Sequence, residues 1–158
     1  MSLGALSVEK TTMIKAKDFF TQDQQDIIVS AVKEAELNTS GEIRVFIEDN
    51  CAGDALDRAA FIFKELEIHK TKERNGVLFY LALSHRKFAI LGDAGINSKV
   101  KKDFWDEIKH EMIRHFKAHD FTTGLSKGII MAGDALKSHF PHQNDNVNEL
   151  PDDIVFGK

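Results

Sequence analysis

The chain has 158 residues and a mass of 17.8 kDa, a length that fits one domain whose core needs no metal or disulfide for stability. Its formal net charge is −4 and its one cysteine is Cys51, which excludes a large basic nucleic-acid-binding face, a disulfide framework and a cysteine-cluster zinc site. The longest apolar run, Val77 to Leu83, is too short to span a membrane. Because no signal-peptide pattern opens the chain, we expect a cytoplasmic protein.

The two prolines divide the folded part of the chain from its end. Both lie after Phe140, in an acidic segment without apolar periodicity, and this composition predicts a disordered tail over residues 141–158. Residues 1–12 are also weak in pattern and are expected to form a leader that could be disordered. The sequence therefore predicts one domain over residues 13–140.

The first half of this domain contains signals for two helices and one strand. A capping box at Thr21 begins a helix whose apolar stripe continues to residue 35. Residues 42–48 alternate apolar and polar side chains, as a half-buried strand does. Asp54 can then cap a second helix that extends to residue 66.

The second half adds two strands and two helices. The continuous apolar run over residues 77–83 is typical of a central strand covered on both sides, and residues 87–91 return as an antiparallel strand after a short polar turn. Helical periodicity follows over residues 100–116 and 122–140. With a fourth strand expected near residues 13–20, the pattern predicts a three-layer α/β/α sandwich around a small mixed sheet of about four strands.

Two motifs imitate catalytic sites with altered spacing. Cys51 and Arg58 enclose a loop one residue longer than the phosphate-binding loop of tyrosine phosphatases, and the aspartates within it would repel phosphate and raise the thiol pKa. We interpret Cys51 as a small buried apolar residue. His110 and His115 are one residue too far apart to ligate zinc from one helix face, whereas His115 and His119 have the right spacing but no evident third ligand.

Acidic residues gather at both ends of the predicted sheet. Because the third strand runs antiparallel to the first, its end brings Asp93 towards Glu42, with Asp103 one to two turns into the following helix. Asp49 and Asp54 lie at the opposite end. Calcium and similar cations need several oxygen ligands, so each set is a candidate metal site, although helix capping also explains Asp54.

Four segments resemble those of the TPM domain family in their order and spacing. They are SGEIRVFIE (40–48), RAAFIFKELEI (58–68), RNGVLFYLALSHRKFAILGDAGI (74–96) and HFKAHDFTTGLSKGI (115–129). The resemblance implies an α/β/α sandwich, divalent-cation binding in acidic loops and, for some members, an acid-phosphatase label. The family's acidic positions correspond here to Glu42, Asp93, Asp103 and Asp120, with a glycine at Gly124.

We therefore expect a stand-alone, bacterial, monomeric TPM-like domain that acts as a metal-responsive interaction or regulatory module rather than an enzyme. Calcium, or another divalent cation, would bind Glu42, Asp93 and Asp103, with Asp49 and Asp54 as the second set. Its partner would be another protein, with no nucleic acid and no membrane span. The alternative is a metal-assisted acid phosphatase that uses the same acids together with His85 or Arg86.

Overall fold

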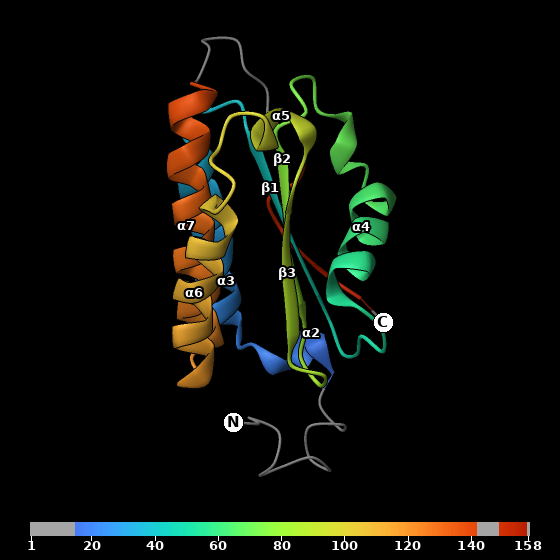
Figure 1. The fold of residues 1–158 in the computed structure, drawn as a ribbon. Helices are drawn as coiled ribbons and strands as arrows, with labels where there is room; N and C mark the ends of the chain where they lie inside the picture. The colour runs from blue at the N-terminus through green and yellow to red at the C-terminus, as the bar shows by residue number, and fades with distance from the viewer. Residues whose placement is uncertain (1–14, 142–148, 158) are drawn as a thin grey trace.

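The computed structural model describes residues 15–141 and 149–157, which form a three-layer α/β/α sandwich. Helices α3, α6 and α7 cover one face of the sheet and α4 covers the other (Figure 1). The strands are β1 (Glu42–Glu48), β2 (Gly76–Ala82), β3 (Lys87–Gly92) and β4 (Ile154–Phe156). The helices are α2 (Ala16–Phe19), α3 (Gln22–Glu36), α4 (Ala55–Glu65), α5 (Ala94–Asn97), α6 (Phe104–Lys117) and α7 (Phe121–His139), with a 3-10 turn, η1 (Ile68–Lys70).

The predicted central strands are confirmed, and their directions match the prediction. The strand order is β3-β2-β1-β4, in which β1 and β2 are parallel and β2 and β3 are antiparallel. Glu42 lies opposite Gly76, and Glu48 lies opposite Ala82. Helix α4 connects β1 to β2, as a parallel pair requires. None of the described helices combines the length and the hydrophobicity that a membrane span needs.

The fourth strand corrects two predictions. The expected strand near residues 13–20 is wrong, because residues 16–19 form helix α2. The fourth strand is β4, which pairs in parallel with β1 through Val45 and Ile154, although residues 154–156 lie in the predicted disordered tail. Its apolar run is too short to show a periodicity, and its partner strand is more than a hundred residues away. The predicted leader over residues 1–12 lies outside the described residues.

Helix starts agree with the predicted caps. The Thr21 hydroxyl accepts the Gln24 amide at 3.1 Å, while the Gln24 side chain accepts the Thr21 amide at 2.9 Å, which completes a capping box. The Asp54 carboxylate accepts the Asp57 amide at 3.0 Å at the start of α4. Asp120 begins α7 in the same way. These local bonds satisfy amide groups that have no partner within their own helix.

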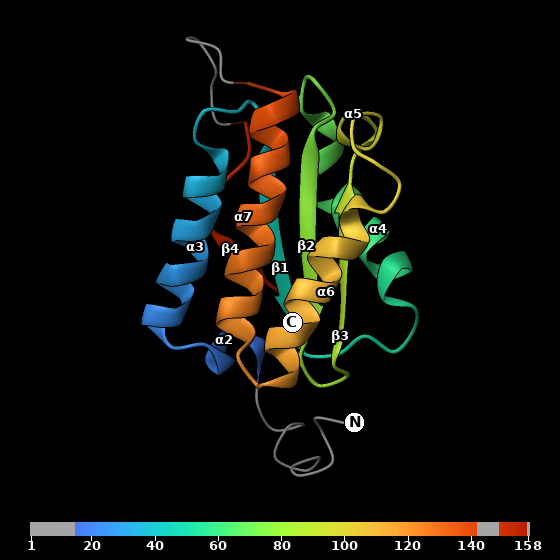
Figure 2. The ribbon, with the colours of Figure 1, turned by 60° about the vertical axis from the view of Figure 1, so that its left-hand side comes forward.

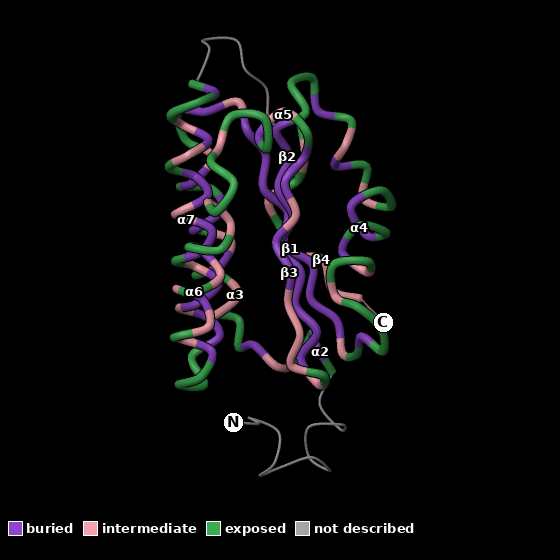
Figure 3. The backbone as a smooth tube through the Cα atoms, viewed as in Figure 1, coloured by how far each residue is buried: buried purple, intermediate pink, exposed green. Residues whose placement is uncertain are grey.

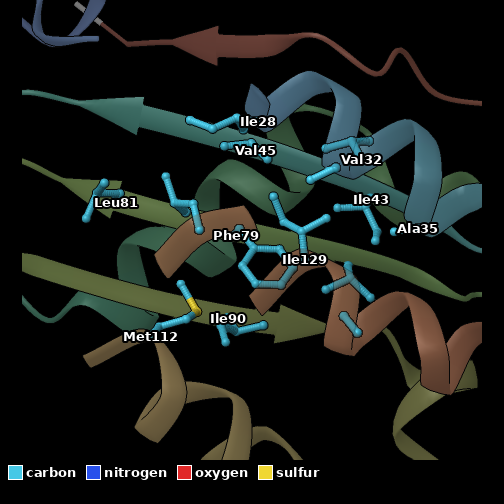
Figure 4. Close-up of a cluster of buried hydrophobic side chains, with 14 of the residues drawn as sticks. Ile28, Val32, Ala35, Ile43, Val45, Phe79, Leu81, Ile90, Met112 and Ile129 are labelled. Carbon is cyan, nitrogen blue, oxygen red and sulfur yellow. The ribbon is translucent and has the colours of Figure 1, made fainter. Parts of the chain in front are cut away.

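The sheet separates two apolar clusters. Ile43, Val45 and Ile47 of β1 belong to the larger cluster, between the sheet and helices α3, α6 and α7, and Figure 4 shows Val45 and Ile43 beside Phe79 and Ile129 there. Figure 2 shows these three helices side by side over the sheet. Successive β1 side chains alternate between the faces, so its polar residues face α4.

Every residue of β1 is buried (Figure 3), including three that carry charged side chains. Glu42 is 3% exposed, Arg44 is 6% exposed and Glu48 is 4% exposed. Burying an ionised group without a partner is costly. The partners of these three side chains therefore identify where the molecule has polar chemistry inside it.

Candidate functional site

The first predicted ligand set is not assembled around one point. Both oxygens of Asp93 bind Arg74, at 2.7 Å to Nε and 2.8 Å to Nη2, and Oδ1 also caps α5. Asp103 is exposed at the start of α6 and its side chain makes no capping bond. Glu42 binds the C-terminal segment instead of either aspartate. A metal site shared by Glu42, Asp93 and Asp103 stays a prediction, and the positions of these three side chains do not support it.

The second predicted set has structural partners as well. Asp49 accepts the Ala16 amide at 2.5 Å and so holds the start of α2 against the end of β1. Asp54 is the α4 cap. Within the described residues, no three Asp, Glu, His or Cys side chains are placed to hold one metal ion.

Carboxyl groups do converge where α3 ends, β1 begins and residues 149–152 cross the sheet edge. We call Glu36, Glu42, Glu149 and Asp152 the C-terminal carboxyl cluster. Glu36 is hydrogen-bonded to Asp152 and accepts the Ile43 amide at 2.7 Å. Glu42 accepts the amides of Glu149 at 2.8 Å and of Leu150 at 3.2 Å. The cluster thus fastens the C-terminal segment to the sheet.

Protons balance part of the charge in this cluster. Burial raises the pKa of Glu36 to about 10, and the hydrogen bond to Asp152 adds to the shift. Burial also raises the pKa of Glu42 to about 7, although the hydrogen bonds from two backbone amides favour its charged form and partly oppose this shift. At neutral pH Glu36 therefore carries a proton, and Glu42 is partly protonated.

Sequence reasoning found Glu42 but missed the other members of the cluster. Glu36 ends a helix with an ordinary amphipathic pattern, and Asp152 lies in the segment predicted to be a tail. Their contact joins positions 116 residues apart in the chain. The one local signal was the apolar run Ile154 to Phe156 after two aspartates, which could have indicated a strand that brings these acids to the sheet.

The opposite end of β1 contains a closed network around Glu48. Glu48 binds Arg58 at 2.9 Å through both carboxylate oxygens and accepts the Tyr80 hydroxyl. The carboxylate raises the pKa of Arg58, whereas burial followed by the Glu48 hydrogen bond raises the pKa of Tyr80. This ion pair uses the arginine that a phosphate-binding loop would need.

The residues beside that network also have partners. Cys51 is 4% exposed, and its amide donates to His85 Nδ1 at 2.8 Å. Lys87 binds the carbonyl groups of Cys51 and Gly53. On α6, His115 contacts Glu111 at 3.1 Å. These bonds hold loops and helices together, and none of them presents a nucleophile beside a free base.

A model of the TPM domain family matches residues 13–135, which is most of the chain and contains the first three strands and every helix except the last turn of α7. The chain belongs to the TPM domain family. The predicted resemblance and the predicted fold class are therefore confirmed. No curated protein matches the sequence significantly.

Solved structures include close and distant relatives of this TPM domain. The BA42 protein of Bizionia argentinensis, solved by NMR, is 43% identical, with 89% of this chain and 97% of that chain covered and a TM-score of 0.83. An N-terminal domain from P. gingivalis is 20% identical, with 79% of this chain and 83% of that chain covered and a TM-score of 0.64. The N-terminal domain of cg2496 from Corynebacterium glutamicum is 13% identical, with 79% of each chain covered and a TM-score of 0.61. The last two likenesses concern the fold alone.

Proposed function

We propose that this TPM domain is a metal-responsive interaction module that binds a divalent cation, calcium first, at the C-terminal carboxyl cluster. The observation that carries the proposal is the clustering of Glu36, Glu42 and Asp152, in which burial raises the pKa of Glu36 to about 10 and that of Glu42 to about 7. A hard cation competes for such oxygen atoms as soon as they lose their protons.

The residue types of the cluster fit calcium. Carboxylate oxygens, backbone carbonyls and waters are the ligands that this ion prefers. In the cluster, Glu36 is hydrogen-bonded to Asp152 and accepts the Ile43 amide, and Glu42 accepts the Glu149 amide. In the described conformation these groups bind protons and amides, so cation binding requires Glu36 and Glu42 to release them. When bound, calcium would supply positive charge to these carboxyl groups.

The functional consequence concerns residues 149–157. Glu42 binds the amides of Glu149 and Leu150, and Lys72 donates its amide to Glu149 at 3.2 Å. A change in the charge or orientation of Glu42 changes how firmly these residues lie against β1. The module would then present a different surface to a protein partner in its cation-bound and cation-free forms.

The melting temperature tests this proposal directly. A ligand that binds only the folded state at 100 times its Kd adds about 2.7 kcal/mol of stability, so calcium should raise the Tm of the wild type. We expect Glu42→Gln to abolish the rise. Asp103→Asn, which changes an exposed member of the first predicted set, is the matched control and should leave it intact. No rise with calcium, magnesium or manganese contradicts the proposal.

The acid-phosphatase alternative has less support from the residues near Cys51. Arg58 is bound by Glu48, and His85 Nδ1 accepts the Cys51 backbone amide, so both side chains already have structural partners. Hydrolysis of a generic phosphomonoester with and without chelator separates the two functions. Metal-dependent turnover that disappears in Asp49→Ala or in Asp54→Ala, with the fold retained, would replace the interaction module with an enzyme.

A further inference from the structure

Arg44 is a buried arginine that forms no ion pair with any residue that the structure describes. It lies in the middle of β1 on the face covered by α4, and only 6% of it is exposed. Its Nε atom is fully buried without a hydrogen-bond partner, and no residue in the ranges 15–141 and 149–157 forms an ion pair with its guanidinium. Removing such a charge from water without a partner is strongly unfavourable.

Two other arginines of the molecule show what Arg44 lacks. Arg58 is held by both oxygens of Glu48 and Arg74 by both oxygens of Asp93. The guanidinium fork matches a carboxylate or a phosphate in this two-bond geometry. The missing partner of Arg44 is therefore expected to be an oxyanion that arrives from outside the described chain.

Arg44 lines a pocket that opens to solvent. The pocket has a volume of about 680 Å³ and lies between η1 and residues 149–151, a size that suits a small molecule. Thr71, which is 3% exposed, lines it beside Arg44. Its hydroxyl accepts the Asn75 amide at 3.2 Å, and the hydroxyl proton remains to be donated to an acceptor.

The exposed lining of the pocket selects among oxyanions. Glu65, Glu67 and Glu149 are exposed there, together with Lys70, and Lys70 is already paired with Glu67 at 3.0 Å. This net negative rim repels a multiply charged anion such as phosphate. It attracts a ligand that carries a positive group close to its carboxylate.

We propose that this pocket binds a small zwitterion of the amino-acid type, with its carboxylate on Arg44 and its ammonium group towards the acidic rim. The ligand's carboxylate provides the counter-ion that none of the described residues provides. This site goes beyond the cation site described above. Because Glu149 belongs to both, the test is made in the presence of a chelator, so that failure of the cation proposal leaves its outcome unchanged.

NMR of the arginine side chains supplies the test, with L-lysine, acetate and inorganic phosphate as probes. We expect L-lysine to shift the Arg44 Nε–Hε signal in a saturable way, acetate to bind about tenfold more weakly and phosphate to bind most weakly of the three, since only lysine satisfies both the guanidinium and the rim. No saturable shift with L-lysine overturns the proposal, as does tighter binding of phosphate than of lysine.

Variants separate the floor of the pocket from its rim. Arg44→Met should weaken L-lysine binding at least about tenfold, whereas Arg114→Met, at an exposed arginine of α6 across the sheet, should not alter it. Glu65→Gln should weaken L-lysine binding by about threefold and leave acetate unchanged or slightly tighter. Equal losses of lysine and acetate in Glu65→Gln contradict the role given to the rim.

The stability of the ligand-free protein gives a second readout. Because Arg44 is buried without a partner, Arg44→Met should leave the Tm unchanged or raise it. If Arg44→Met instead lowers the Tm substantially, as removal of one member of a buried ion pair does, Arg44 has a structural partner within the chain and the proposal is wrong.

Discussion

Glu42, Arg44 and Glu48 lie on one face of β1, and the three side chains have different surroundings. Glu48 binds Arg58 and accepts the Tyr80 hydroxyl. Glu42 is fastened to two backbone amides and partly protonated. Arg44 faces a pocket. One strand thus carries a purely structural ion pair at one end and, towards the other, the two positions that we associate with ligands.

The Glu48 network should dominate the stability of its end of the sheet. Replacing Glu48 with Ala leaves Arg58 and the buried Tyr80 hydroxyl without their acceptor, so we expect a loss of about 3 kcal/mol or more in urea unfolding. Tyr80→Phe removes one hydrogen bond and leaves the ion pair, and should cost about 1 kcal/mol. Equal costs for the two variants would mean that the ion pair adds nothing to the hydroxyl bond.

At the level of elements, local signals predicted the four longer helices, α3, α4, α6 and α7, and the central strands. The capping box at Thr21 and the aspartate caps act within four residues of each helix start, so one sequence contains them. Strand β4 could not be identified in this way, because its three residues acquire strand structure only from pairing with β1. The carboxyl cluster was missed for the same reason, since Asp152 reaches Glu36 only after β4 has paired.

Close packing of α3 on α7 should depend on Gly133. A Cβ atom at this position would lie 2.5 Å from the Ala35 Cβ and 2.7 Å from its Cα, so a methyl group there forces the two helices apart. We expect Gly133→Ala to cost about 1–3 kcal/mol. Gly53→Ala is the matched control, because a Cβ atom at Gly53 meets nothing within 4 Å. Equal unfolding midpoints for the two variants would contradict this packing.

At the scale of the whole molecule, the raised pKa values of Glu36 and Glu42 predict a fall in stability as the pH rises. Below pH 4.5 both groups are protonated in the folded and unfolded states. Above it the unfolded chain loses protons that the folded chain keeps. Up to about pH 7 both glutamates should contribute to the fall in stability, and from there to about pH 10 Glu36 alone of the two should contribute.

The groups with lowered pKa values do not mask this trend. Glu111 and Asp120 have pKa values below their ordinary values because of hydrogen bonds to His115 and Thr123, so the stability they contribute is lost only at acid pH. Thermal melts between pH 5 and pH 9 measure the slope of Tm against pH. Glu42→Gln should flatten this slope below pH 7. A Tm that rises across this range would contradict the raised pKa values of Glu36 and Glu42.

Cation binding at the C-terminal carboxyl cluster is the basis of the proposed function, and the backbone amides that donate to its carboxyl groups report on this binding. In a calcium titration followed by NMR, we expect saturable shifts for the amides of Ile43, Glu149 and Leu150, with an affinity that increases from pH 6 to pH 8 as protons leave. The other predicted sites have reporters of their own, namely the amides of Ala16, Asp57 and Ala94. Saturable shifts confined to those amides, or no shifts at all, would contradict the claim.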